Sequence, residues 1–150
     1  MYKKILVPLD GSKRAERILP HAEELASRYR AKVILLTALE YAFAVGVEGS
    51  FIEFSEQEKD FKARTKDAES YLKGISEKFS KKDIETQRVV ANGPAVERII
   101  QVADKENADL IAMTSHGGGG LTRVFYGSVT AGVLNRTDRP LLVIRSRKES

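Results

Sequence analysis

The chain has 150 residues, of which 42% are hydrophobic, and this is enough apolar surface for a single well-packed domain over residues 1–150. It contains no cysteine, which excludes disulfides, thiolate zinc sites and cysteine nucleophiles and agrees with a cytoplasmic location. The net charge is +4, but the 25 basic and 21 acidic residues are interleaved and lack the aromatic spacing of a base-stacking surface, which disfavours nucleic-acid binding.

The N-terminal segment predicts a short strand rather than a signal peptide. Residues 4–9 are apolar apart from Lys4, and Asp10 ends this run long before the core of a signal peptide would be complete. The apolar region 33–47 is interrupted by Glu40 and falls short of the roughly 20 residues that cross a bilayer. We therefore expect a soluble protein with no membrane partner.

A helix and a second strand follow. In residues 15–29 apolar side chains recur at helical spacing. Pro20 lies inside this pattern, so we expect a kink or the loss of one backbone hydrogen bond. Residues 33–39 are continuously apolar, which is typical of a strand buried on both faces of a parallel sheet, and we place this strand at the centre of the sheet.

The segment after the second strand has no regular pattern, whereas the segments beyond it do. Residues 40–55 lack a clear period and contain two glycines, which predicts a long surface loop, although its aromatic residues indicate that something covers it. The later pattern predicts a helix over 56–79, a strand over 84–91, a helix after the turn at 92–94, a strand over 109–115, a helix over 128–135 and a strand over 140–145.

This alternation of strands and helices predicts the α/β class. We expect a single-domain, Rossmann-like, five-stranded parallel sheet with right-handed crossovers and helices on both faces. Ligands of such sheets collect beyond the carboxyl ends of the strands, where the strand order reverses. Asp10 follows the first strand, and a glycine-rich loop follows the fourth. We therefore expect both to line one pocket.

The glycine-rich loop is the most distinctive stretch of the chain. Residues 114–120 read Thr-Ser-His-Gly-Gly-Gly-Gly, and Gly127 and Ser128 follow. Glycines let a backbone approach a ligand, and a helix that begins at Ser128 would aim free amides at an anion, which predicts a nucleotide phosphate site. The alternative is a linker without a ligand. Neither G-x-x-x-x-G-K-[ST] nor G-x-G-x-x-G is present.

The turn after the first strand is the second candidate. The Asp10 carboxylate could accept hydrogen bonds from ribose hydroxyls or from an adenine amine, and Gly11 permits a sharp turn. The simpler alternative is that Asp10 or Ser12 caps the helix that follows. A phosphatase of the haloacid dehalogenase class would need a second acidic residue where Ser12 stands.

A longer pattern resembles the ATP-binding branch of the universal stress protein family over the whole chain. That branch carries G-x2-G-x9-G-[ST] after the fourth strand. Residues 117–128 match its second half without a gap, while Thr114 stands at the first glycine. Val-Pro-x-Asp-Gly-Ser at 7–12, Ser-His-Gly at 115–117 and the closing strand at 140–145 add to the resemblance.

The resemblance implies an adenine nucleotide alpha hydrolase-like sheet that binds ATP, ADP or AMP, with Mg²⁺ or Mn²⁺ on the phosphates. It implies that Asp10 holds the ribose or the adenine and that the backbone around Ala38 reads the adenine edge. Thr114 stands where the family motif has its first glycine, so the ligand contact of that glycine is in question. The hydroxyl of Thr114 could supply a hydrogen bond in its place. The resemblance assigns Pro8, Leu9 and Met113 to the wall around the base, and Gly117, Gly127, Ser128 and Val129 to the phosphates.

The two histidines offer little further chemistry. His116 lies in the loop, where it could donate to a phosphate or only cap the end of the fourth strand. His21 lies on a charged helix face and is expected to be solvated. A metal site on the protein itself is disfavoured, because the histidines have no i, i+4 partner and no cysteine is present.

Three functions remain open. The first is a homodimeric, ATP-binding stress or signalling module, in which the apolar edge strand 141–144 pairs with its twofold mate, as the family resemblance also implies. The second is a slow ATP hydrolase or phosphotransferase that uses Asp10, although no general base is arranged for it. The third is a nucleotide-free interaction module, in which Thr114 marks the loss of the site.

Overall fold

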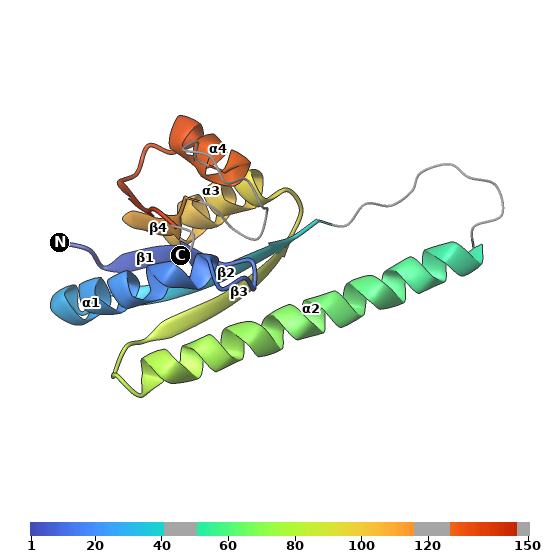
Figure 1. Cartoon of the computed structure of the whole chain (residues 1–150), viewed down its shortest axis with the longest axis horizontal. Helices are drawn as coiled ribbons and strands as arrows, with labels where there is room; N and C mark the ends of the chain where they lie inside the picture. The colour runs from blue at the N-terminus through green and yellow to red at the C-terminus, as the bar shows by residue number, and fades with distance from the viewer. Residues whose placement is uncertain (41–50, 116–126, 147–150) are drawn as a thin grey trace.

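The computed structural model describes residues 1–40, 51–115 and 127–146, with only the backbone described for 51–55. Its core is a parallel sheet of five strands in the order β3-β2-β1-β4-β5, which confirms the predicted fold class (Figure 1). The strands are β1 (Lys4–Pro8), β2 (Lys32–Leu39), β3 (Thr86–Asn92), β4 (Leu110–Thr114) and β5 (Leu141–Ile144).

Helices cover both faces of this sheet. They are α1 (Leu19–Tyr29), which follows a 3₁₀ turn η1 (Ala15–Ile18), and α2 (Phe51–Ser80), α3 (Ala95–Glu106) and α4 (Ser128–Arg136). Side chains alternate along each strand, so Ile5 and Val7 join a core cluster with α1 and α2, whereas Leu6 joins a second cluster with α3 and α4. We call these the α1–α2 cluster and the α3–α4 cluster.

The middle strand is β1, which corrects the expectation that β2 is central. β2 lies between β1 and the edge strand β3, yet its residues 33–37 are all buried. Any interior strand of a parallel sheet is covered on both faces by helices. A continuous apolar run therefore marks an interior strand but does not identify the middle one.

Pro20 divides the helical segment 15–29 instead of kinking it. Residues before it form the turn η1, and Pro20 falls in the first turn of α1. Amides of the first turn have no partner inside the helix, so a proline there removes no intrahelical hydrogen bond. The expected loss of a hydrogen bond is therefore wrong.

The helix α2 begins at Phe51 rather than at residue 56. The predicted loop over 40–55 is therefore wrong for 51–55, while residues 41–50 lie outside the described residues. Residues 51–60 contain no glycine or proline that would stop a helix, although their apolar period is irregular. The N-terminal part of α2 runs past the end of the sheet (Figure 1). No helix among the described residues is long and apolar enough to span a membrane.

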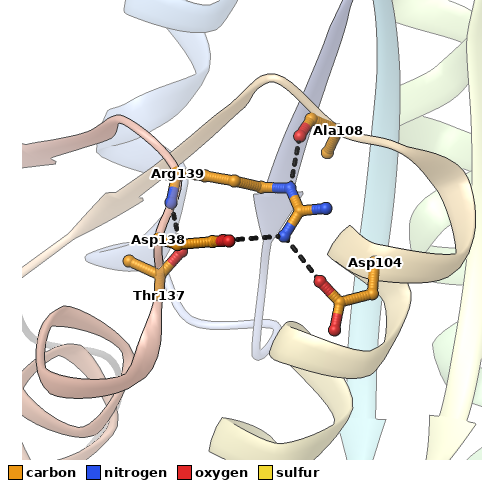
Figure 2. A network of polar contacts seen from close by, with 5 residues as sticks. All are labelled: Asp104, Ala108, Thr137, Asp138 and Arg139. Atoms are coloured by element: carbon orange, nitrogen blue, oxygen red, sulfur yellow. Dashed lines mark hydrogen bonds and ion pairs between the residues drawn. The ribbon is translucent and has the colours of Figure 1, made fainter.

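A network of polar contacts ties the amino end of the sheet together. Arg139, just before β5, donates from Nε to the carbonyl oxygen of Ala108 at 2.6 Å and from Nη1 to Asp104 at 2.6 Å (Figure 2). Asp138 accepts a further hydrogen bond from Nη1 at 3.2 Å. One guanidinium thus joins the end of α3, the entry to β4 and the entry to β5.

Candidate functional site

The strand order reverses between β1 and β4, which are parallel neighbours with Ile5 opposite Leu110. The chain leaves β1 toward β2 on one side and leaves β4 toward β5 on the other. A crevice beyond the carboxyl ends of two such strands is the usual ligand position in this class of sheet. The prediction that the Asp10 turn and the segment after β4 start from one edge is confirmed, although His116 and Gly117 lie outside the described residues.

The turn after β1 is closed by its own side chains. Asp10 Oδ1 accepts the backbone N–H of Ser12 at 2.9 Å, and Ser12 Oγ accepts the N–H of Ala15 at 3.2 Å. Gly11 has a φ of +86°, which an L side chain rarely adopts. Arg14 is the N-cap of η1 and makes no capping hydrogen bond, so the simpler alternative, in which Asp10 or Ser12 is the N-cap, is wrong, although Ser12 accepts the first amide of η1. Asp10 shapes the turn and is exposed at the sheet edge, where a ligand could reach its carboxylate.

The end of β2 presents backbone groups to the same edge. β1 ends at Pro8, opposite Leu36, while β2 continues to Leu39. The carbonyl oxygen of Leu36 accepts the N–H of Leu9 at 2.8 Å, so it points toward β1. Backbone groups two residues apart point to the same side of a strand, so the N–H and C=O of Ala38 point to the side that β1 has left. A nucleobase edge needs such a donor and acceptor pair.

The start of α4 is fixed to the end of β4 by two hydrogen bonds. The N–H of Gly127 donates to the carbonyl oxygen of Ser115 at 2.7 Å, and the hydroxyl of Thr130 donates to that of Thr114 at 2.9 Å. The Thr130 side chain is buried, so this second contact is shielded from water. The helix N-terminus is therefore held at the carboxyl end of β4.

This helix start has the properties of an anion site. Gly127 is the N-cap, and the first intrahelical bond runs from the N–H of Ala131 to its carbonyl oxygen at 2.9 Å. The amides of Ser128, Val129 and Thr130 precede that bond and lie at the positive end of the helix dipole. A phosphate placed there would receive several donors and favourable charge.

The predicted wall around the base does not share one face of the sheet. Leu9 lies in the α1–α2 cluster and is 4% exposed, whereas Met113 lies in the α3–α4 cluster and is 6% exposed. Pro8 is half-buried at the end of β1. Thr114 is only 5% exposed, so most of its side chain is enclosed by protein. The assignment of these residues to the base remains a prediction.

Tyr71 of α2 is a neighbour of the site that the sequence did not single out. Burial raises the pKa of Tyr71 above its ordinary value, and the carboxylates of Glu16 and then Asp10 raise it further. The phenol is thus neutral and close to the turn after β1. The apolar periodicity of α2 could not predict the surroundings of Tyr71, because such a pattern indicates which side chains are buried but not which distant segment they contact.

The described residues contain no group of three or more His, Cys, Asp or Glu side chains that could hold a metal ion. Mg²⁺ commonly reaches proteins through the phosphates of its nucleotide, with few protein ligands. A divalent ion would therefore be compatible with this part of the site only as the companion of a bound triphosphate.

Comparison with known proteins places the chain beside one family. The model of the universal stress protein family matches residues 1–145. Universal stress protein MJ0577 of Methanocaldococcus jannaschii is 31% identical over 160 residues, covering 100% of this chain and 98% of that protein. The solved structure of MJ0577 superposes with a TM-score of 0.86 at 28% identity, covering 99% of each chain.

Two more distant structures were solved with adenine nucleotides. A universal stress protein in complex with cAMP has a TM-score of 0.62 at 22% identity and covers 97% of this chain and 98% of its own. A universal stress protein of Archaeoglobus fulgidus in complex with dAMP has a TM-score of 0.63 at 21% identity and covers 95% and 98%. At these identities the likeness shows the shared fold.

Proposed function

Because this chain belongs to the universal stress protein family, we propose that it is an adenine-nucleotide-binding module, with ATP as the leading ligand and ADP or AMP as alternatives. The observation that carries the proposal is that the Asp10 turn follows β1 and the start of α4 lies after β4, the two neighbouring strands between which the strand order reverses. The complexes of two relatives with cAMP and dAMP support an adenine nucleotide as the ligand.

Each part of the nucleotide has a matching group in this proposal. The phosphates lie against the amides of Ser128 and Val129, together with Gly117 and His116 from the loop. The ribose hydroxyls donate to the exposed carboxylate of Asp10, and the adenine edge meets the backbone of Ala38. Mg²⁺ or Mn²⁺ accompanies the phosphates and neutralises their charge.

We propose that occupancy of this site acts as a signal in the cytoplasm. The nucleotide joins segments from both halves of the sheet, so its binding and release change the order of this edge. Asp10 is engaged in its own turn through the Ser12 amide, which favours a role in binding over a role as nucleophile. Slow hydrolysis of ATP is then a side reaction of a binding site.

Isothermal titration calorimetry with ATP and Mg²⁺ tests the proposal. Asp10→Ala removes a charged acceptor and is expected to raise the Kd about ten- to hundredfold. Gly127→Val is expected to weaken binding with little loss of fold, because Gly127 has φ −54° and ψ 157°, which valine adopts readily. Asp60→Ala, the same change at an exposed position of α2, is the control and should leave the Kd unchanged.

The alternatives give different results. Flat titrations with ATP, ADP and AMP at millimolar concentration, together with no nucleotide in a mass spectrum of the purified protein, would support the nucleotide-free module. Multiple-turnover cleavage of ATP that Asp10→Ala abolishes would support the enzyme. Tight binding with negligible turnover is the result that we expect.

A further inference from the structure

The hydrogen-bond ladder between β4 and β5 changes its pattern where β4 ends. The two strands are parallel, with Thr114 opposite Ile144. Ser115 continues this register, because its N–H donates to the carbonyl oxygen of Ile144 at 2.8 Å. In a regular parallel ladder the carbonyl oxygen of Ser115 would next accept the N–H of Ser146, two residues beyond Ile144. The structure departs from the regular pattern at this carbonyl.

The amide of Gly127 takes the place that the ladder reserves for the amide of Ser146. The N–H of Gly127 donates to the carbonyl oxygen of Ser115 at 2.7 Å, which holds the N-cap of α4 on the end of β4. The N–H of Ser146 donates instead to Ser115 Oγ at 3.2 Å. Ser115 is only 4% exposed, so water has little access to its oxygen atoms. One residue thus bonds the chain after β5 with its hydroxyl and the start of α4 with its carbonyl.

This arrangement depends on the hydroxyl of Ser115. Without Oγ, the amide of Ser146 would lose its acceptor, which costs free energy at a partly buried position, or it would turn to the carbonyl oxygen of Ser115. The second response would place Ser146 in competition with Gly127 for one oxygen atom. A displaced Gly127 would shift the amides of Ser128 and Val129, which follow it directly.

We propose that Ser115 is a positioning residue, whose hydroxyl substitutes for its own carbonyl oxygen as the acceptor of the Ser146 amide and thereby leaves that carbonyl to Gly127. The hydroxyl of Thr130 still bonds the carbonyl oxygen of Thr114, so its loss from Ser115 should move the N-cap and not unfold α4. The effect on phosphate binding rests on the proposed function, whereas the link between Ser115 and α4 does not.

Ser115→Ala tests the inference by removing a single oxygen atom. In the nucleotide-free protein, NMR should show the amide of Gly127 exchanging with deuterium about three- to tenfold faster, the range expected for one net hydrogen bond. The Kd for ATP should rise by a similar factor, while the Kd for adenosine, which has no phosphate, should stay the same. Ser76→Ala is the matched control, because Ser76 bonds the hydroxyl of Thr86 at the amino end of the sheet, and it should change none of these quantities.

Two outcomes for Ser115→Ala would overturn the inference. An equal rise in the Kd for ATP and for adenosine would show general loosening of the site, in place of a shift of the phosphate amides. Unchanged exchange at Gly127 would overturn the link between Ser115 and α4, whatever the affinity for ATP.

A double variant tests the competition for the carbonyl oxygen. Ser146→Pro removes the competing amide, because proline has no backbone N–H, so Gly127 should keep its slow exchange in this variant. Adding Ser115→Ala to Ser146→Pro should then cause no further change. A further increase in exchange equal to that in the wild-type background would overturn the inference.

Ser115→Thr and Ser115→Val cover the case in which Ser115→Ala does not fold. The two new side chains have nearly the same shape, and only threonine keeps the hydroxyl. The amide of Gly127 should therefore exchange more slowly in Ser115→Thr than in Ser115→Val, and equal exchange would contradict the inference. If the wild type binds no adenine nucleotide, the proposed function fails, and the exchange rates still decide whether Ser115 holds α4.

Discussion

Gly132 of α4 lies where this helix crosses α3, at a place with no room for a side chain. A Cβ atom added at Gly132 would lie 2.7 Å from a methyl carbon of Val96. The two helices therefore approach closely, and this contact sets the height of α4 above the sheet. Since α4 carries the proposed phosphate amides, a small residue one helical turn beyond Ser128 influences where those amides lie.

We expect Gly132→Ala to destabilise the protein, because overpacking of this kind costs about 1–3 kcal/mol and exceeds the gain of about 1 kcal/mol in helix propensity. Thermal or urea unfolding measures the change, and adding Val96→Ala should recover part of it. Gly74→Ala is the control, since nothing lies within 4 Å of a Cβ at Gly74 and the position is exposed on α2. It should be stabilising, and equal effects at both sites would refute the steric explanation.

Between elements, the guanidinium of Arg139 connects α3, β4 and β5 at the edge opposite the proposed site (Figure 2). The side chain is only 20% exposed, so its contact with the carbonyl oxygen of Ala108 is partly shielded from water. Lysine cannot reproduce the planar fork that serves Ala108 and Asp104 together. The network therefore fixes how the last strand enters the sheet.

Arg139→Ala should lower the free energy of unfolding by about 1–3 kcal/mol, because it leaves the Ala108 carbonyl without its partner. Arg139→Lys should recover little of this loss. Arg28→Ala is the matched control, because Arg28 and Glu24 form an exposed pair one helical turn apart, worth about 0.5 kcal/mol or less. Chemical denaturation compares the three variants, and similar losses for Arg28 and Arg139 would argue against the network.

At the scale of the whole molecule, β5 is the strand through which we propose that two copies pair. In the described sheet it has only β4 as a neighbour, so its other edge presents backbone groups to a partner. Leu142 and Ile144 pack against the α1–α2 cluster and Leu141 against the α3–α4 cluster, while Val143 is in neither. Val143 is therefore the apolar side chain of β5 that is best placed to meet a twofold mate.

Val143→Glu should convert a dimer into a monomer with little loss of stability, because two carboxylates would face each other across the twofold axis. Light scattering coupled to gel filtration measures the mass. Arg88→Glu introduces the same side chain at an exposed position of the other edge strand, β3, and should leave the mass unchanged. A monomeric wild type would contradict pairing through β5, as would dissociation in Arg88→Glu alone.

The order of strands and helices along the sequence was enough to predict much of the edge of the sheet where we place the ligand. Alternating strands and helices were sufficient to predict the parallel sheet and to bring Asp10 and the start of α4 to one edge, because right-handed crossovers leave few other topologies. The start of α2 was missed, because residues 51–55 lost the apolar period without containing a helix breaker. Leu9 and Met113 were assigned to one wall, although strand alternation places them in different clusters.

The sequence by itself determined which residues are buried, the order of the elements and the membership of the universal stress protein family, since local periodicity and motif spacing record these directly. Only the tertiary structure decided that β1 ends opposite Leu36, two residues before Ala38, and that the side chain of Tyr71 in α2 packs against the cluster that contains Leu9. Both depend on how segments far apart in the chain are aligned in space. The sequence pattern of one segment does not specify this alignment, because the local conformational preferences of the segment are the same whichever distant segment packs against it.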